Sequence, residues 1–393
     1  MNLATWANED SFKIMLKILH KYLASTFILP FLGSLGFFVL FLLTSQLFRI
    51  MGFAVQKNVE WAVIFELMGH ICMSFLAISL PLAGLFAMIY AMGKLSDDAE
   101  IIAMRSFGLS KYKLFAPFFF LSIAIGFFAY LLSSDVIPYS QDRFKNQVVR
   151  MTSKGALSEI KPGEFFTEIP SLTLFAEKVK NDGELLEDVF IYDKGQEQNR
   201  IISAKKADFI IQNKDDLTKE IKLKFKFYDG NLFQYKHNEV NFQKVNFETY
   251  EMPINGKNFE IGSVSKDSML SSKELRKKIT WNEKKVASKN AKRDDHVTLA
   301  KSKIELLSRY NTPIQFLIFI LVGFSLGIKS MRGNKNNSSY YGIIFLLAHY
   351  FLFLGGVSAA KKLTIPVEAA IFGPTLISFL FGAMLFRKMD WVS

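Results

Sequence analysis

Six long apolar runs dominate the two ends of the chain. They contain few or no charged residues and cover residues 22–48, 65–93, 114–134, 310–328, 336–360 and 369–386. About 20 apolar helical residues cross a bilayer core about 30 Å thick, so the pattern predicts six transmembrane helices, three on each side of a polar block. The first run exceeds the apolar core of a signal peptide, about 7–15 residues, and no small-residue cleavage site follows it. We therefore expect it to stay in the mature protein.

The polar block changes the hydrophobic period from helical to two. From Ile221 to Tyr228 apolar residues alternate with lysines, which is typical of a half-buried strand with a polar outer face. The other candidate strands cover residues 172–179, 186–192, 201–211, 232–235 and 240–250, and the turn signals lie at 181–183, 193–195 and 229–230. Short strands without intervening helices favour a sandwich, a jelly roll or an open barrel, whose exposed edge can accept another strand.

The predicted fold class is an α-helical membrane protein with six transmembrane helices and an all-β, jellyroll-like domain between spans three and four. Residues 1–134 hold an interfacial helix or charged anchor over 12–23, three spans and a short helix at about 95–108. Residues 135–270 form the β-domain, 271–309 a helical return segment, and 310–393 the last three spans. The basic run of the return segment, residues 276–285, is interpreted as a solvated face rather than a nucleic-acid site.

Basic residues set the expected orientation, because Lys and Arg gather on the cytoplasmic side of membrane proteins. With the N-terminus inside, twelve lie on the inner side: Lys13, Lys17, Lys21, Lys94, Arg105, Lys111, Lys113, Lys329, Arg332, Lys335, Arg387 and Lys388. Four lie outside: Arg49, Lys57, Lys361 and Lys362. Both termini should be cytoplasmic and the β-domain should lie outside.

The composition supports the division into membrane and polar parts and argues against catalysis. The chain is 50% hydrophobic, and 59 of its Asp, Glu, Lys and Arg residues lie between Asp135 and Arg309, against 25 elsewhere. Its single cysteine, Cys72, has no partner in the chain for a disulfide or a Cys-based metal site. Phosphate loops, zinc-binding helices and nucleophile elbows are absent from the sequence. We expect no cofactor and no ATP site.

Two histidines of the apolar runs leave alternatives open. Glu66 and His70 stand four apart and could share a proton or a metal, although two ligands are too few for a metal site and a hydrogen-bonded pair is the more frequent case. His349 lies near the middle of the fifth run, where an ionisable residue indicates either a functional site or hydrogen bonding between helices.

The connection between spans two and three predicts a short, well-capped helix. Asp97 is a suitable N-cap, Glu100 follows three positions later, and Gly108 can terminate the helix. Ile101, Met104 and Phe107 recur at helical spacing. Such an amphipathic helix either enters a groove on a partner protein or lies on the membrane surface.

These residues resemble a known family. The run from Lys94 to Ser110, the Arg49-Ile50-Met51-Gly52 exit of the first span, the three-plus-three spans around a β-rich insert, and Arg309 before Pro313 are similar to the LptF/LptG permeases of the lipopolysaccharide export system. The resemblance covers essentially the whole chain. The Arg49 region and Gly93-Lys94-Leu95 are closer to the LptF branch.

The resemblance implies an inner-membrane, non-catalytic permease subunit with a periplasmic jellyroll. Its implied partners are a cytoplasmic ATPase dimer, a homologous permease, a single-span periplasmic jellyroll subunit, a periplasmic bridge protein and lipopolysaccharide. The ATPase-coupling helix would carry Asp98, Glu100, Ile101, Met104, Arg105 and Phe107. Arg49 matches a basic position that contacts the lipid in the family, whereas Gln46 stands where related chains can carry a second basic residue.

The basic residues on the outer side indicate an anion-binding site independently of the family resemblance. Arg49, Lys57, Lys361 and Lys362 lie at the outer ends of spans, where an anionic glycolipid presents phosphates. The alternative is ordinary anchoring to lipid headgroups by snorkelling.

The sequence thus predicts a permease that extracts lipopolysaccharide from the outer leaflet of the inner membrane and passes it to a periplasmic jellyroll bridge, powered by a separate ATPase. The alternative is an ion-coupled secondary transporter, because three spans on each side of an outer insert run in opposite directions, as in an inverted repeat. That class calls for carboxylates in mid-membrane, which are missing from the runs. A membrane-anchored enzyme and a simple scaffold fit less well.

Overall fold

The computed structural model describes residues 9–56, 61–158, 160–167, 172–180, 185–194, 198–212, 222–236, 243–254, 266–288, 292–328 and 338–389. The chain divides into two compact units, each of which is described by itself. The first consists of Met1–Arg49, Met68–Gln141 and Ser265–Ser393, and the second of Ile50–Leu67 and Asp142–Val264.

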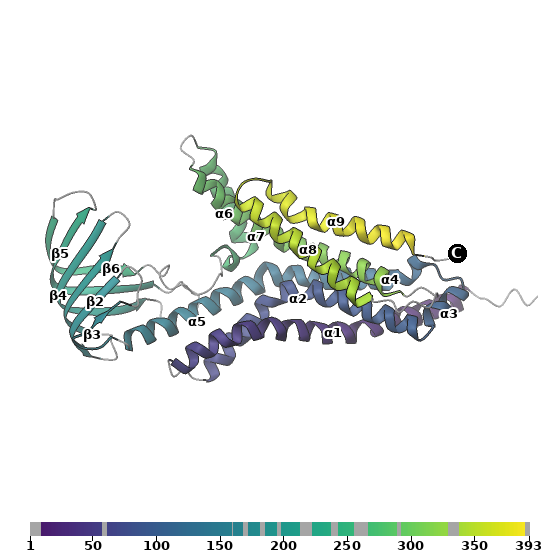
Figure 1. The fold of residues 1–393 in the computed structure, drawn as a ribbon, viewed down its shortest axis with the longest axis horizontal. Coiled ribbons are helices and arrows are strands. Elements are labelled where there is room, and N and C mark those ends of the chain that lie inside the picture. The colour runs from purple at the N-terminus through teal and green to yellow at the C-terminus, as the bar shows by residue number, and fades with distance from the viewer. Residues whose placement is uncertain are drawn as a thin grey trace, which may run out of the picture. The chain divides into compact units, whose positions relative to one another are not determined.

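Long apolar helices build the first unit. They are α1 (Glu9–Gln56), α2 (Trp61–Asp97), α4 (Lys111–Leu131), α7 (Arg293–Gly327), α8 (Ser338–Lys361) and α9 (Val367–Lys388), labelled in Figure 1. Within the described residues, six helices are long and apolar enough to cross a membrane. The six predicted apolar helices are confirmed.

Glycines allow α2 and α7 to approach very closely. A Cβ atom at Gly323 would lie 2.8 Å from the backbone oxygen of Leu85, and one at Gly327 would lie 2.9 Å from that of Ile89. Gly323 and Gly327 are four residues apart, so both lie on one face of α7. Small residues at this spacing let two helix backbones meet in a bilayer.

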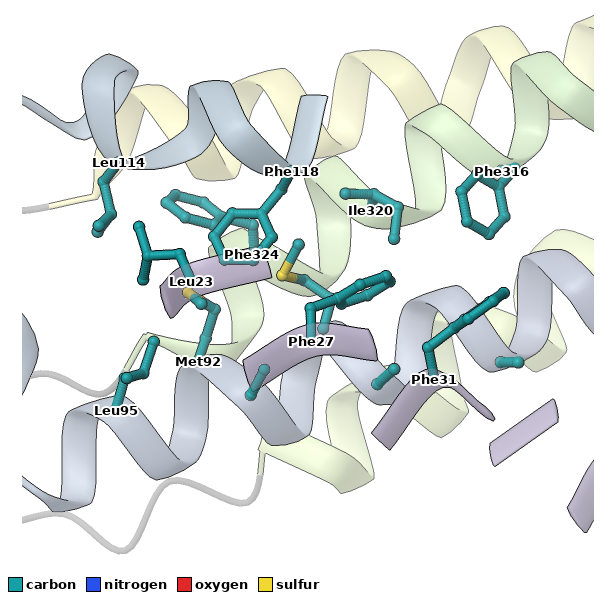
Figure 2. Close-up of a cluster of buried hydrophobic side chains, with 14 of the residues drawn as sticks. Leu23, Phe27, Phe31, Met92, Leu95, Leu114, Phe118, Phe316, Ile320 and Phe324 are labelled. Atoms are coloured by element: carbon teal, nitrogen blue, oxygen red, sulfur yellow. The ribbon is translucent and has the colours of Figure 1, made fainter. Parts of the chain in front are cut away.

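A cluster of buried side chains joins five of these helices, α1, α2, α4, α7 and α9. Figure 2 shows Phe27 and Phe31 of α1 pointing toward side chains of α4 and α7. The ring centroids of Phe27 and Phe118 lie 6.1 Å apart, and those of Phe31 and Phe316 lie 5.9 Å apart, both in edge-to-face geometry. The labelled members are Leu23, Phe27, Phe31, Met92, Leu95, Leu114, Phe118, Phe316, Ile320 and Phe324. The other members are Leu80, Ala83, Ala87, Met88, Ala91, Ile101, Met104, Leu109, Ala129 and Phe386. We call the whole set the core cluster.

The third long helix extends beyond its uncharged run. A π-helical segment, Leu132–Val136, follows α4 directly and leads into α5 (Ile137–Ser158). The predicted β-domain begins at residue 135, whereas residues 137–158 are helical and the first described strand begins at Phe165. Residues 137–158 are polar on one helical face, and the uncharged-run criterion therefore missed them.

The second unit contains one antiparallel sheet with its strands in chain order. They are β1 (Phe165–Phe166), β2 (Leu172–Lys180), β3 (Leu185–Lys194), β4 (Gln198–Gln212), β5 (Lys222–Lys236) and β6 (Gln243–Ile254) (Figure 1). The predicted turn at Asp229-Gly230 is wrong, because β5 continues through it. Gly230 is needed there, since a Cβ would lie 2.4 Å from the Ser203 backbone oxygen.

Along the strands of this sheet every second residue is buried, and this alternation shifts by one residue at one row of neighbouring positions. Asp188 and Asp229 lie in this row with φ values of 50° and 48°. The row crosses β3, β4 and β5, because the residue pairs before and after it have the same register. Buried positions change parity there: Leu186 to Val189 in β3, Ala204 to Ala207 in β4, and Phe227 to Leu232 in β5. The long strands therefore keep one apolar face, which forms the core of this unit.

The segment that leads back to α7 is helical. After a 3-10 turn at Lys266–Met269, α6 (Ser272–Val286) begins with a capping box formed by Ser271 and Glu274. It packs along the polar first part of α7, where Lys285 and Lys303 form ion pairs of 2.6 Å and 2.7 Å with Asp295 and Glu283.

Candidate functional site

The connection between α2 and α4 forms the short helix α3 (Glu100–Ser106). Asp97 belongs to the end of α2 and does not cap α3, so the predicted N-cap is wrong. The cap residue is Ala99 in the left-handed region, with φ 58° and no capping side chain. The chain turns there through a hydrogen bond of 3.1 Å from the Ala99 amide to the Ser96 carbonyl. A backbone turn thus replaces the expected side-chain cap.

Gly108 ends α3, as predicted. Its φ is 76°, and its amide donates to the Arg105 carbonyl at 2.9 Å. The Leu109 amide donates to the Met104 carbonyl at 3.3 Å. This pair of bonds is a Schellman motif, which favours glycine at the left-handed position.

The apolar residues of α3 point in two directions. Ile101 and Met104 are buried and belong to the core cluster together with Leu109. Phe107 is 81% exposed and Ile102 is 37% exposed. The structure therefore places Ile101 and Met104 inside the chain and leaves Phe107 for an external contact. Periodicity alone could not show which apolar residues the chain itself covers.

The charged residues of α3 lie at its surface. Glu100 is half-buried, and its Oε1 accepts a hydrogen bond of 2.9 Å from the hydroxyl of Tyr22 on α1. Asp98 is exposed and Arg105 is half-buried. Tyr22 could not be predicted from the sequence, because 78 residues separate it from Glu100 and no motif contains both.

A pocket of about 310 Å³ opens between α1 and α3. Its lining residues are Leu19, Tyr22, Glu100, Ala103, Met104, Phe107 and Leu109. Glu100 is the only charged residue in this set, and the wall is otherwise almost entirely apolar. Glu100 therefore lines the pocket mainly through its carbon atoms and not through its carboxylate oxygens.

Lys111 connects this region to the end of α9. Its Nζ donates to the Phe386 carbonyl at 2.9 Å and lies 5.3 Å from the centre of the Phe386 ring. A cation is favourable at a helix C-terminus, where carbonyl groups lack partners. The sequence showed Lys111 only as one of the inner basic residues, and its position beside α9 depends on tertiary packing.

The predicted lipid-phosphate residues are only partly described. Arg49 lies in α1, but its side chain lies outside the described part of the structure, as does the whole of Lys57. Lys361 and Lys362 are exposed where α8 ends. Gln46 is half-buried on α1. Whether these residues converge on one ligand stays a prediction.

A buried polar clamp lies where the chain returns to the helix bundle. Arg309 is 5% exposed and donates to Glu305 at 3.2 Å, to the Ser272 hydroxyl at 3.2 Å, and to the backbone of Asp267 and Ser268 at 3.4 Å. The Asp267 carboxylate accepts from Lys278 and from Ser302. We call Arg309 and these partners the Arg309 clamp.

Residues 21–388 match the family described as the lipopolysaccharide export system permease LptF/LptG. The chain belongs to the LptF/LptG family. Similar curated proteins include an uncharacterized protein, RP871, of Rickettsia prowazekii (strain Madrid E), which is 22% identical over 155 residues, 39% of this chain. The lipopolysaccharide export system permease protein LptG of Haemophilus influenzae (strain ATCC 51907 / DSM 11121 / KW20 / Rd) is 24% identical over 136 residues, 35% of this chain. The chain spans only 42% and 37% of the lengths of these two relatives.

The LptF/LptG family consists of membrane permease subunits of the lipopolysaccharide export system. The six apolar helices fit a protein that crosses the membrane several times. The closer likeness to the LptF branch stays a prediction.

His349 is a structural connector among the last three spans of this LptF/LptG chain. Its Nδ1 lies 2.7 Å from the Ser378 hydroxyl on α9, and its Nε2 lies 3.0 Å from the Gln315 amide on α7. Ser378 donates to the Pro374 carbonyl at 2.9 Å, so it accepts from Nδ1–H, and Nε2 accepts from Gln315. The interpretation of His349 as a hydrogen-bonding residue between helices is confirmed.

Proposed function

We propose that this LptF/LptG chain is the permease subunit of an ABC transporter that takes lipopolysaccharide from the outer leaflet of the inner membrane. It passes the lipid to a periplasmic bridge of jellyroll domains, and a separate cytoplasmic ATPase dimer supplies the energy. The family match and the six apolar helices beside a six-stranded sheet support this proposal. A homologous permease completes the membrane part, as the two names of the family suggest.

The orientation follows from the basic residues. Both termini and α3 face the cytoplasm and the sheet faces the periplasm, because this orientation puts twelve of the basic residues that flank the spans on the cytoplasmic side and four on the other. The sheet acts as the jellyroll acceptor.

The packing of α3 is the observation that carries the proposal. Ile101 and Met104 belong to the same core cluster as α1, α2, α4 and α7. A packed core transmits displacement because it contains little free volume. A push or pull on α3 by the ATPase dimer therefore moves the helices that surround the lipid.

The lipid is held near the outer ends of the spans. Arg49, Lys57, Lys361 and Lys362 supply positive charge at the depth of its phosphates. Exposed apolar side chains of α1, such as Phe41 and Phe48, supply contact with acyl chains.

A charge reversal in α3 tests the coupling. In the complex with the partner permease and the ATPase dimer, Glu100→Lys should abolish co-purification or stimulated ATP turnover. Glu164→Lys is the matched control, since Glu164 is an exposed acid in the other unit. Unchanged coupling in the Glu100 variant would contradict the proposal.

Photocrosslinking tests the cargo. A photoreactive residue at Phe48 or Arg49 should capture lipopolysaccharide in membranes. Capture of bulk phospholipid alone would favour the anchoring role of the outer cations. Transport that depends on an ion gradient without ATP would favour the secondary-transporter alternative.

A further inference from the structure

Buried polar side chains occupy two successive helical turns where α7 and α9 pack against each other. In one turn, His349 of α8 joins Gln315 of α7 to Ser378 of α9 in a hydrogen-bonded network. The other turn holds Asn311 of α7 and Thr375 of α9, which are 1% and 2% exposed. Within the described part of the chain, neither the Asn311 Oδ1 nor the Thr375 Oγ1 has a hydrogen-bond partner. Because buried polar groups in proteins are nearly always hydrogen-bonded, this pair indicates a bound ligand.

The packing of the two helices puts Asn311 and Thr375 in the same layer. One turn earlier on each helix, Leu307 of α7 packs against the apolar cluster that contains Ile371 of α9. One turn later on each helix lies the network around His349, which again joins α7 to α9. Since α7 and α9 meet in the layers before and after it, the layer between them brings Asn311 and Thr375 together. We call this layer the polar layer.

Two prolines add hydrogen-bond acceptors beside the polar layer. Pro313 lies inside α7 and Pro374 inside α9, and a proline has no backbone N–H to donate. The carbonyls of Arg309 and Ala370, each four residues earlier, therefore lack their usual helical donor. A ligand that completes this layer must donate hydrogen bonds or carry positive charge.

Charge decides between water and a metal cation as the ligand. A cation at this depth needs negative charge close by, because an unpaired charge inside a bilayer is costly. Within α7 and α9 the nearest acids are Glu305, six residues before Asn311, and Glu368, seven residues before Thr375. Glu305 is already paired with Arg309. A buried water makes about three hydrogen bonds and brings no charge, so it fits the polar layer better.

We propose that the polar layer is a binding site for an internal water that bridges Asn311 and Thr375. The water donates to the Asn311 Oδ1 and accepts from the Thr375 hydroxyl, and its second O–H binds a carbonyl that a proline has freed. This site depends on neither the cargo nor the ATPase of the proposed function. A bridging water can change partners when two helices shift slightly, whereas the direct contact of α7 with α2 at Gly323 leaves no space for one. The contact of α7 with α9 can therefore yield without leaving a buried polar group unpaired.

Two substitutions distinguish a bridging water from two polar groups that are simply unpaired. Thr375→Val keeps the shape of the side chain and removes its hydroxyl, and Asn311→Leu removes the amide. The measurement is the unfolding equilibrium constant of the full chain, titrated with a denaturing detergent in mixed micelles. Thr312→Val is the matched control, because Thr312 lies on α7 and its hydroxyl donates to the Ser308 carbonyl of the same helix at 3.1 Å.

The sign of the stability change is the decisive result. With a bridging water, each single substitution should raise the unfolding equilibrium constant about three- to tenfold, because the water loses a partner. The double variant should change it by less than the product of the two, since one water connects both groups. The control should stay within about twofold of the unchanged chain. Without a water, Thr375→Val removes an unpaired buried group, so a lower unfolding constant in this variant would overturn the inference.

Radiolytic labelling in isotope-labelled water locates the ligand in the unchanged chain. A short X-ray exposure in lipid nanodiscs turns a bound water into a hydroxyl radical, which should oxidise side chains beside it, such as Pro313. The buried apolar stretch 320–324 of the same helix should stay unlabelled, and the Asn311→Leu/Thr375→Val double variant should lose the label. Absence of the label from the unchanged chain would overturn the inference. A stability that rises when Na⁺ replaces choline in the buffer would also overturn it, because the ligand would then be a cation.

Discussion

Replacing Ile101 by alanine should release α3 from the helix bundle without unfolding the bundle. Ile101 is 3% exposed in the core cluster, and α3 has only seven residues. Helices this short are unstable alone in water, so buried side chains must hold α3 in place. Core isoleucine-to-alanine changes cost about 2–5 kcal/mol. The lower value already corresponds to a loss of about 30-fold in the docking equilibrium of α3.

Hydrogen exchange measures this loss directly. In nanodiscs, amide protection of a peptide that covers α3 should fall about 30-fold or more, whereas peptides from the core of α7 keep their rates. ATP hydrolysis by the partner dimer should continue while transport falls. Ile102→Ala is the matched control, because it makes the same change at a neighbouring residue that is 37% exposed. Equal loosening in both variants, or unchanged exchange in the Ile101 variant, would refute the reasoning.

Three further predictions concern stability. Arg309→Met should lower the free energy of unfolding by about 3–5 kcal/mol, because it leaves the buried partners of the guanidinium without a hydrogen-bond donor. Arg309→Lys should lower it less. A loss below about 1 kcal/mol for Arg309→Met in denaturant titrations would contradict the role of the Arg309 clamp. Gly323→Ala should lower the free energy of unfolding by about 1–3 kcal/mol, since its Cβ would lie 2.8 Å from a backbone oxygen of α2. Gly33→Ala, whose Cβ would have nothing within 4 Å, should leave the stability unchanged. Equal melting temperatures of the two variants would argue against the close contact of α2 and α7. The sheet should weaken in acid, because hydrogen bonds from lysines lower the pKa of Glu187 and of Glu251. This stabilisation is complete above the ordinary glutamate pKa of about 4.3 and is lost as the pH falls through the lowered folded-state values, so replacing both by Gln should flatten the acid limb of the circular dichroism signal.

Much of the architecture could be predicted because each feature left a local signal. An apolar run of about 20 residues with almost no charge is the typical signal of a span, and the six such runs correspond to the six long apolar helices. Alternation in Ile221–Tyr228 indicated the first half of β5, and Gly108 indicated the end of α3. These signals depend on neighbours in sequence, where propensity and period act directly.

The rest depended on contacts between distant residues. Asp229 and Gly230 have the composition of a turn, yet pairing with both neighbouring strands continues β5 through them. The apolar stripe of α3 was visible, but packing in the core cluster decides that Ile101 is buried and Phe107 is not. Tyr22 carries no signal in the sequence, because only the fold brings its hydroxyl to Glu100.

The packing of α2 and α7 gives the coupling region a stiff connection to the far end of the bundle. The end of α2 leads into α3 within a few residues, and the glycines of α7 bring its backbone against that of α2. Near its middle α7 carries Arg309, which donates hydrogen bonds to the segment that follows the sheet in the chain. A displacement of α3 therefore has a path to the return segment that contains no loop. On this argument, loosening the α2–α7 crossing through Gly323 should weaken coupling even where Glu100 and its pocket are intact, and the Gly33 variant should not.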